Sequence, residues 1–261
     1  MKKICYIFFA ISIAFTACKK GDLVESTPYT KINVGDPAYS FLRFINITPG
    51  SPNINFYLND VRITGAYNAL SGETGFGYNT IFPNLSGQYL PITPGTNKID
   101  AKIVSSATVD KGLNVLNTNI NTNGGRYYTL FTTGSYNTTD KKIPSSYLLE
   151  EVKPVLDTTK VFVRLVNLYS GGPAAVDMTQ PSTGRVLISN VAYNSASAFI
   201  EIPLPGQVNI YQFNNAGTST PTAPGQLTTT LTKGQAYTFI LRGIAGSTTS
   251  PFGISSYTTF Y

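Results

Sequence analysis

The chain carries one seven-residue stretch twice. Residues 41–47 read FLRFINI and residues 162–168 read FVRLVNL, so an arginine and an asparagine recur at the same places. The surrounding residues are aromatic or aliphatic, and many are β-branched, which is typical of a β-strand. We interpret the two stretches as the same strand in two copies of one unit.

Three further matches follow in the same order along the chain. Ala66-Tyr67-Asn68 returns at 192–194, Pro94-Gly95 returns at 205–206, and the segment 125–131 returns at 234–240. Because the order is kept throughout, we infer a tandem duplication. The polar and aromatic residues that recur are expected to be structural: Arg43, Asn46 and Tyr128 in the first copy, and Arg164, Asn167 and Tyr237 in the second.

Composition and turn spacing indicate an all-β fold. Tyrosine (17) and phenylalanine (15) are abundant, charged residues make up only 12%, and no stretch after the N-terminal segment has sustained helical periodicity. Short strands with frequent turn signals predict two tandem antiparallel immunoglobulin-like β-sandwich domains. The expected boundaries are a signal peptide at 1–17, a lipidated cysteine and flexible tether at 18–38, the first sandwich at 39–152, a linker at 153–159, and the second sandwich at 160–261.

The N-terminal segment is typical of an export signal. Two lysines follow Met1, residues 4–15 are apolar except for Ser12, and Phe15-Thr16-Ala17-Cys18 comes next. A membrane-spanning helix needs about 20 apolar residues, and this stretch is shorter. Small residues before a cysteine resemble the lipobox of bacterial lipoproteins. That resemblance implies cleavage before Cys18, lipidation of Cys18, the lipid bilayer as a partner, and a place in the cell envelope as an outer-membrane lipoprotein. It leaves the membrane leaflet open.

The residue types that are missing exclude most catalytic chemistry. The chain has no histidine, and its two cysteines are Cys5, inside the signal, and Cys18. Histidine-based catalysis, thiol nucleophiles and thiolate metal sites are therefore excluded from the mature chain. The acidic residues are scattered, and no basic stripe is present. We expect no catalytic residue, no metal, no cofactor and no nucleic-acid partner.

The repeated motifs resemble a known family. Each copy has a strand with Arg-x-x-Asn followed by a proline, a Pro-Gly turn, and a late Gly-x-x-Tyr-Thr strand. This pattern resembles the lipoprotein domains grouped as domain of unknown function 4397, over nearly all of residues 39–261. The resemblance implies a sandwich fold and an envelope location, and it carries over no catalytic residue.

An aromatic insertion in the first copy is the candidate site for a ligand or partner. Residues 71–87 are extra relative to the second copy, and they set Phe76, Tyr78 and Phe82 among glycines. Aromatic rings on a long loop can stack on sugars or fill a partner's pocket. The alternative is a flap folded over its own sandwich or against the second copy.

The remaining charged candidates have ordinary interpretations. For Arg43 and Arg164, the alternative to a ligand-binding cation is an arginine that lies along the sheet and pairs with a nearby carboxylate or carbonyl. Glu150 and Glu151 are adjacent on an expected strand, so their side chains point to opposite faces. We expect the carboxylates to be solvated.

These observations favour a non-catalytic envelope lipoprotein that acts as a binding, adhesion or assembly module. A polysaccharide or an envelope protein is the expected partner. Two alternatives remain open: capture of surface polysaccharide by the 71–87 insertion, and a glycan-active enzyme that uses a pair of carboxylates.

Overall fold

The computed structural model describes residues 31–70, 72–85, 87–202 and 209–261. The expected signal peptide, Cys18 and most of the expected tether lie outside these residues. Both repeats belong to one compact unit, Val34–Tyr261. Every element in the described part of the chain is a β-strand.

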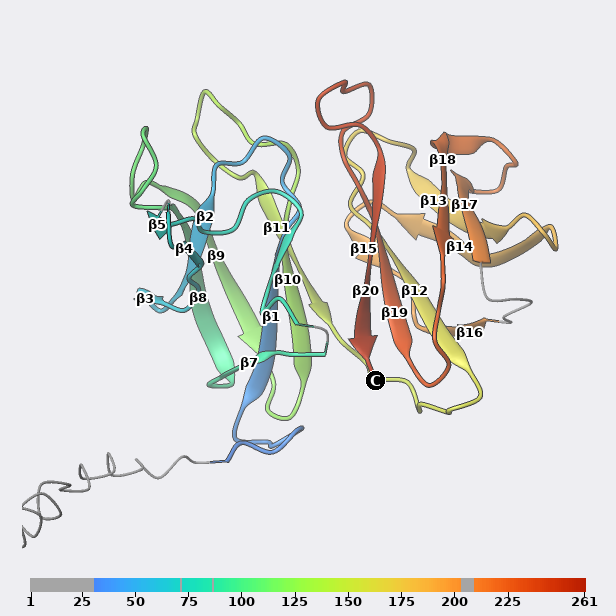
Figure 1. Cartoon of the computed structure of the whole chain (residues 1–261), viewed down its shortest axis with the longest axis horizontal. Helices are drawn as coiled ribbons and strands as arrows, with labels where there is room; N and C mark the ends of the chain where they lie inside the picture. Colours follow the sequence, from blue (N-terminus) through green and yellow to red (C-terminus); the bar gives the residue numbers. More distant parts are fainter. Residues whose placement is uncertain (1–30, 71, 86, 203–208) are drawn as a thin grey trace, which may run out of the picture. The chain divides into compact units, whose positions relative to one another are not determined.

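The first repeat folds into a five-stranded sheet and a four-stranded sheet (Figure 1). The five-stranded sheet has the order β11–β10–β1–β6, with β7 also paired to β1. Its strands are β1 (Ser40–Asn46), β6 (Thr80–Phe82), β7 (Leu90–Ile92), β10 (Tyr127–Thr133) and β11 (Ser145–Glu150). The four-stranded sheet has the order β3–β2–β8–β9, with β2 (Ile54–Leu58), β3 (Val61–Arg62), β8 (Gly95–Ile103) and β9 (Asn114–Thr122). A short hairpin joins β4 (Tyr67–Asn68) to β5 (Gly72–Glu73).

The second repeat builds the same pair of sheets. Its five-stranded sheet has the order β15–β12–β19–β20, with β16 also paired to β12. The strands are β12 (Val161–Asn167), β15 (Ser195–Ala196), β16 (Ile200–Ile202), β19 (Ala236–Arg242) and β20 (Gly253–Phe260). Its four-stranded sheet has the order β14–β13–β17–β18, with β13 (Ala175–Gln180), β14 (Arg185–Ala192), β17 (Asn209–Asn215) and β18 (Pro221–Thr229).

The five-stranded sheets are mixed. β1 pairs parallel with β10, and β12 pairs parallel with β19, in equivalent register: Arg43 lies opposite Thr129, and Arg164 lies opposite Thr238. The all-β class is confirmed, and apart from these two parallel pairs the neighbouring strands of the described sheets pair antiparallel, as expected. A parallel pair joins strands far apart in sequence, so no turn signal announces it.

Alternation along β1 and β12 buries both faces of each five-stranded sheet. Leu42 and Phe44 point into the core of the first repeat, and Val163 and Leu165 point into the core of the second. The intervening side chains form a third buried cluster that draws on both repeats: Ile45, Ile47, Phe131, Val166, Leu168 and Ile240. Because successive side chains on a strand face opposite sides, one strand can serve two cores.

Matched tyrosines and asparagines make matched hydrogen bonds. The Tyr128 hydroxyl accepts from a backbone N–H five residues upstream at 3.0 Å, and the Tyr237 hydroxyl does the same at 2.9 Å. This arrangement is the tyrosine corner of immunoglobulin-like sandwiches. Asn46 and Asn167 each accept from the backbone N–H two residues later and donate to the carbonyl of another segment. The four residues therefore fix the same turns in both repeats.

Candidate binding groove in the first repeat

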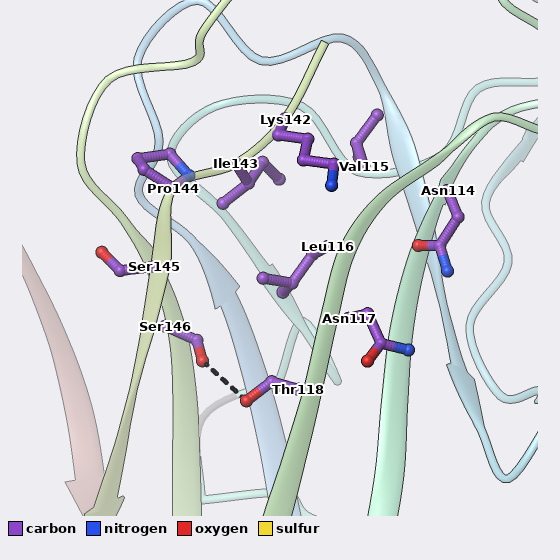
Figure 2. Close-up of a pocket in the computed structure, with 10 residues that line it drawn as sticks. All are labelled: Asn114, Val115, Leu116, Asn117, Thr118, Lys142, Ile143, Pro144, Ser145 and Ser146. Carbon is purple, nitrogen blue, oxygen red and sulfur yellow. Dashed lines mark hydrogen bonds between the residues drawn. The ribbon is translucent and has the colours of Figure 1, made fainter. Parts of the chain in front are cut away.

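A groove of about 520 Å³ opens at one side of the first repeat (Figure 2). It lies between β9, an edge strand of the four-stranded sheet, and the segment leading into β11, an edge strand of the five-stranded sheet. Its lining residues are Asn114, Val115, Leu116, Asn117, Thr118, Lys142, Ile143, Pro144, Ser145 and Ser146. The volume is in the range of small-molecule sites, roughly 300–1,000 Å³.

The local sequence explains the shape of the groove. A register shift where β8 passes from Ala101 to Lys102 interrupts the pairing with β9. Val115 and Leu116 are therefore both buried although they are neighbours, and the exposed Asn114 and Asn117 flank them. Such irregularities recur at sheet edges and redirect side chains.

Two hydrogen bonds connect the walls of the groove. The backbone N–H of Ile143 donates to the carbonyl of Val115 at 2.8 Å. The Ser146 hydroxyl donates to the Thr118 hydroxyl at 3.4 Å, as Figure 2 shows. These bonds hold the 142–146 segment against β9, so the groove is preformed.

A buried carboxylate orients the two amides of the groove. Asp100 on β8 is 1% exposed, and its Oδ1 accepts from Asn114 Nδ2 at 2.7 Å and from Asn117 Nδ2 at 2.6 Å. Its Oδ2 lies 3.0 Å from the Lys98 ammonium. Burial alone would raise the pKa of Asp100, but the hydrogen bonds from Asn114, Lys98 and Asn117 outweigh it and hold the pKa below its ordinary value. Asp100 therefore stays ionised and holds both amides in one orientation.

The groove offers hydrogen bonds without an acid–base pair. Its polar groups are amides, hydroxyls and the Lys142 ammonium, and its apolar wall is aliphatic. An adjoining pocket of about 450 Å³ adds Asn137 and Asp140. No two carboxylates line either of these pockets, and the described residues hold no cluster of three potential metal ligands. This arrangement can bind a polar ligand.

The aromatic insertion folds back on its own repeat. Phe76 is buried, and its backbone bridges Ile54 with hydrogen bonds of 2.8 and 3.1 Å. Phe82 lies on β6, pairs opposite Phe44, and meets the Phe76 ring edge-on at 5.3 Å between ring centroids. The glycine-rich sequence concealed β6, which was expected to be a loop.

Tyr78 contacts the second repeat and is only partly exposed to solvent. Its hydroxyl accepts a hydrogen bond from Arg242 Nη1 at 3.2 Å, and the neighbouring Asn79 accepts one from the Ser255 hydroxyl at 2.7 Å. Phe76, Tyr78 and Phe82 therefore do not present one aromatic surface. These contacts fit the interpretation of the insertion as a flap folded over its own sandwich and against the second repeat.

The two matched arginines are buried at equivalent places with different partners. Arg164 is 2% exposed, forms an ion pair with Glu151 of the first repeat, and donates from Nε to the Thr238 hydroxyl at 2.8 Å. Arg43 is fully buried and donates from Nε and Nη2 to the carbonyl of Gln88 at 3.1 and 2.9 Å. Both guanidinium groups lie among side chains on the shared face of the five-stranded sheets.

Several carboxylates are buried, so the expectation that they are solvated is wrong for them. These are Glu73, Asp100, Glu151 and Asp177, each 7% exposed or less. Glu73 receives hydrogen bonds from Asn55 and Ser105 and pairs with Arg62. Every one of the four has polar partners on the protein, which is what burial of a carboxylate requires.

Sequence reasoning missed the groove. Its lining comes from a segment with asparagine at positions 114, 117, 119, 121 and 123, which reads as a polar loop. The signal that could have revealed a strand is the buried trio Val115, Leu116 and Ile120 within this segment. The described residues contain no helix long and apolar enough to cross a membrane.

Comparison with known proteins gives one family match. No curated protein matches the chain. Among solved structures, it is similar to a family 26 carbohydrate-binding module, CBMbc of Amy13K from Eubacterium rectale, solved with maltoheptaose. That likeness has 12% identity and a TM-score of 0.24, covering 85% of this chain and 98% of the module. A likeness this low says nothing about what the present chain binds.

The family model matches residues 40–179, which is more than half of the 261 residues. The match begins at the first residue of β1 and ends in β13, so it takes in the whole first repeat and the start of the second. The chain therefore belongs to the family described as domain of unknown function, DUF4397.

Proposed function

We propose that this protein is a non-catalytic, lipid-anchored binding protein of the cell envelope, and that the β9–β11 groove holds a segment of a glycan chain. The observation that carries the proposal is the preformed groove, in which amide and hydroxyl groups face an aliphatic wall. Sugars present both donors and acceptors around apolar C–H faces, and this lining complements both.

The amides of the groove are prepared for such a ligand. Because Asn114 and Asn117 each donate to Asp100, their carbonyl oxygens are left to accept from sugar hydroxyls. Further hydrogen-bond donors and acceptors come from the hydroxyls of Ser145, Ser146 and Thr118. Side chains that are already oriented lose less entropy when a ligand binds.

The absence of catalysis in this proposal rests on the residue types in the groove. Glycoside hydrolysis uses two carboxylates roughly 5–10 Å apart across the bond that breaks. Asp100 is buried and bound to three partners, and Asp140 lines only the adjoining pocket. The chain has no histidine to serve as a general base.

The envelope location rests on the sequence around Cys18. A lipidated cysteine provides about 0.8 kcal/mol of membrane affinity per buried methylene, and stable anchoring takes more than one acyl chain. We expect Cys18→Ser to block processing or to release the protein from the membrane fraction. Cell fractionation after a high-salt wash checks this, and a processed Cys18→Ser protein that still sediments with membranes would contradict the anchor.

A matched pair of asparagines tests the groove. Asn117 lines it, whereas Asn119 lies two residues further along β9, on the same face, and does not. We expect Asn117→Ala to weaken glycan binding roughly 3- to 10-fold, the worth of one hydrogen bond. Asn119→Ala should leave binding unchanged.

The measurement is a glycan array with the purified protein, followed by calorimetric titration of each hit. Thermal unfolding of both variants controls for the fold, because Asp100 keeps Asn114 and Lys98 as partners when Asn117 is removed. Binding that is equal in the two variants, or no binding to any glycan, would contradict the proposal.

A further inference from the structure

We infer that the glycan held by this protein is acidic, bearing carboxylate or sulfate groups, and that Lys102 and Lys142 select it. This inference rests on the proposed function and names the chemical class of its ligand. It follows from the charges that surround Asn114 and Asn117 and from the partners those charges have.

The outer face of the four-stranded sheet lies beside the groove, because β9 belongs to both. In the pairing of β8 with β9, Lys102 lies opposite Asn114, and Asp100 lies opposite Asn117. One strand further, Tyr57 on β2 lies opposite Asp100. From β9 to β2 is two strand spacings, or about 10 Å, so a chain of a few sugar units that leaves the groove reaches this face.

The acidic groups of this face have cationic partners. Asp100 and Asp60 both contact the Lys98 ammonium, at 3.0 and 2.9 Å, and those contacts raise the pKa of Lys98. Glu73, nearer the hairpin, is paired with Arg62. Lys98 offsets one of the two carboxylate charges beside it, and Arg62 offsets the charge of Glu73.

Two lysines at or beside the groove, by contrast, have no carboxylate partner among the described residues. The Lys102 ammonium lies 4.5 Å from the centroid of the Tyr57 ring, whose negative face holds it over the sheet. Lys142 is exposed at the groove, and Figure 2 shows its side chain extending from the 142–146 segment toward β9. Lys142 lines the groove, and Lys102 lies on the neighbouring strand opposite Asn114, which also lines the groove.

An anionic group on the ligand would make the strongest interactions with these two ammonium groups. A hydrogen bond between an ammonium and a carboxylate or sulfate is roughly twice as strong as one between neutral groups. The amides of the groove would then bind hydroxyls of the same chain while the lysines bind its charges. A neutral glycan would leave both ammonium groups without a counterion.

Paired oligosaccharides that differ only in charge provide the test. Oligogalacturonate, oligomannuronate and hyaluronan fragments are titrated into the purified protein beside their methyl esters, which keep the sugar chain and remove the charge. We expect at least one acidic form to bind about 10-fold more tightly than its ester in low salt. Most of that difference should vanish near 1 M NaCl, where the screening length is about 3 Å.

Lysine variants test whether Lys102 and Lys142 cause the preference for the acidic glycan. Lys102→Gln and Lys142→Gln should each weaken binding of the acidic form about 2- to 5-fold, the range of an exposed ion pair, and leave the ester unchanged. Lys233→Gln is the control, because Lys233 is an exposed lysine of the second repeat without an ion pair in the described chain. Its binding should match that of the unaltered protein.

The outcomes separate the two proposals. If an ester or another neutral glycan binds as tightly as the acidic form, the inference is wrong and the glycan-binding function stands. Equal losses in Lys102→Gln, Lys142→Gln and Lys233→Gln would also overturn it, since the charge would then act from anywhere on the surface. If neither acidic nor neutral glycans bind, the proposed function fails and the inference falls with it.

Discussion

The two repeats share their buried contacts and differ on their outer faces. In both, the same tyrosine and the same asparagine close the same turns, and the central parallel strands pair in the same register. On the outer face of the four-stranded sheets the likeness ends. On that face Asp100 lies opposite Tyr57 in the first repeat, whereas Gln212 lies opposite Thr179 in the second.

The polar groups of the second repeat bind one another. Gln212 donates to Asn214 at 3.1 Å, Asn214 donates to Thr179 at 3.3 Å, and Gln226 donates to Gln212 at 3.3 Å. In the first repeat, one carboxylate gathers two amides and leaves their oxygens open to a groove. The two repeats thus share their internal contacts and differ on their outer faces, and the first repeat carries the site that we propose.

Breaking the inter-repeat ion pair should have the largest effect. Arg164→Met leaves the Glu151 carboxylate buried without its cation, which typically costs about 3–5 kcal/mol of unfolding free energy. Arg43→Met removes a cation whose hydrogen-bond partner is a carbonyl, so we expect a smaller loss, about 1.5–3 kcal/mol. Denaturant unfolding of the two variants measures the difference.

A double variant isolates the cause. Arg164→Met combined with Glu151→Met replaces the buried pair by apolar side chains and should recover most of the lost stability. Equal losses for Arg43→Met and Arg164→Met, or no recovery in the double variant, would show that the ion pair does not distinguish the two arginines.

Removing the hydroxyl from either tyrosine corner should lower the unfolding free energy by a similar amount. Tyr128→Phe and Tyr237→Phe each remove a hydroxyl that accepts a backbone N–H, which should cost about 0.5–1.5 kcal/mol in either repeat. Tyr237 should lie at the upper end, because its hydroxyl also donates to Gln235 at 2.6 Å. Thermal unfolding of the two variants sharpens the comparison, and a loss confined to one repeat would contradict equivalent roles.

Acid should lower the stability of the first repeat, because Asp100 becomes protonated. Its pKa is below the ordinary value of about 3.9, so its contribution to stability is complete above that pH and is lost as the pH falls through the folded-state pKa. Asp100→Asn should lower stability at neutral pH and flatten its fall below about pH 4, by at most about 1.4 kcal/mol per pH unit for one proton. Unfolding curves across that range measure the slope of the unfolding free energy against pH. The same slope in Asp100→Asn and in the unaltered protein would show that Asp100 does not cause the loss of stability in acid.

Where the side-chain pattern was simple, the sequence was enough to place strands. β2 and β10 can be recognised in the sequence, because aromatic, aliphatic and β-branched residues dominate them and turn residues flank them. β9 was missed because its exposed positions are asparagine, which disfavours strands, and because the register shift beside Lys102 spoils the alternation.

Contacts between the repeats could not be read from the chain. Glu151 follows the exposed Glu150 in the sequence. Nothing in these two adjacent glutamates indicates that Glu151 is buried and pairs with Arg164 of the next repeat. The groove likewise joins residues of β9 to a segment more than twenty positions later, so it exists only once both sheets have formed.

The pairing of β1 also has a mechanical consequence. The proposed lipid anchor precedes β1, so tension between the membrane and a captured ligand enters the sandwich where β1 begins, at Ser40. β1 lies between β10 on one side and β6 and β7 on the other, and backbone hydrogen bonds bridge it to both neighbours. A pull along the strand loads these bonds in shear, all together, instead of opening them one after another. Under the proposed anchoring, β1 is therefore the strand that would bear the load.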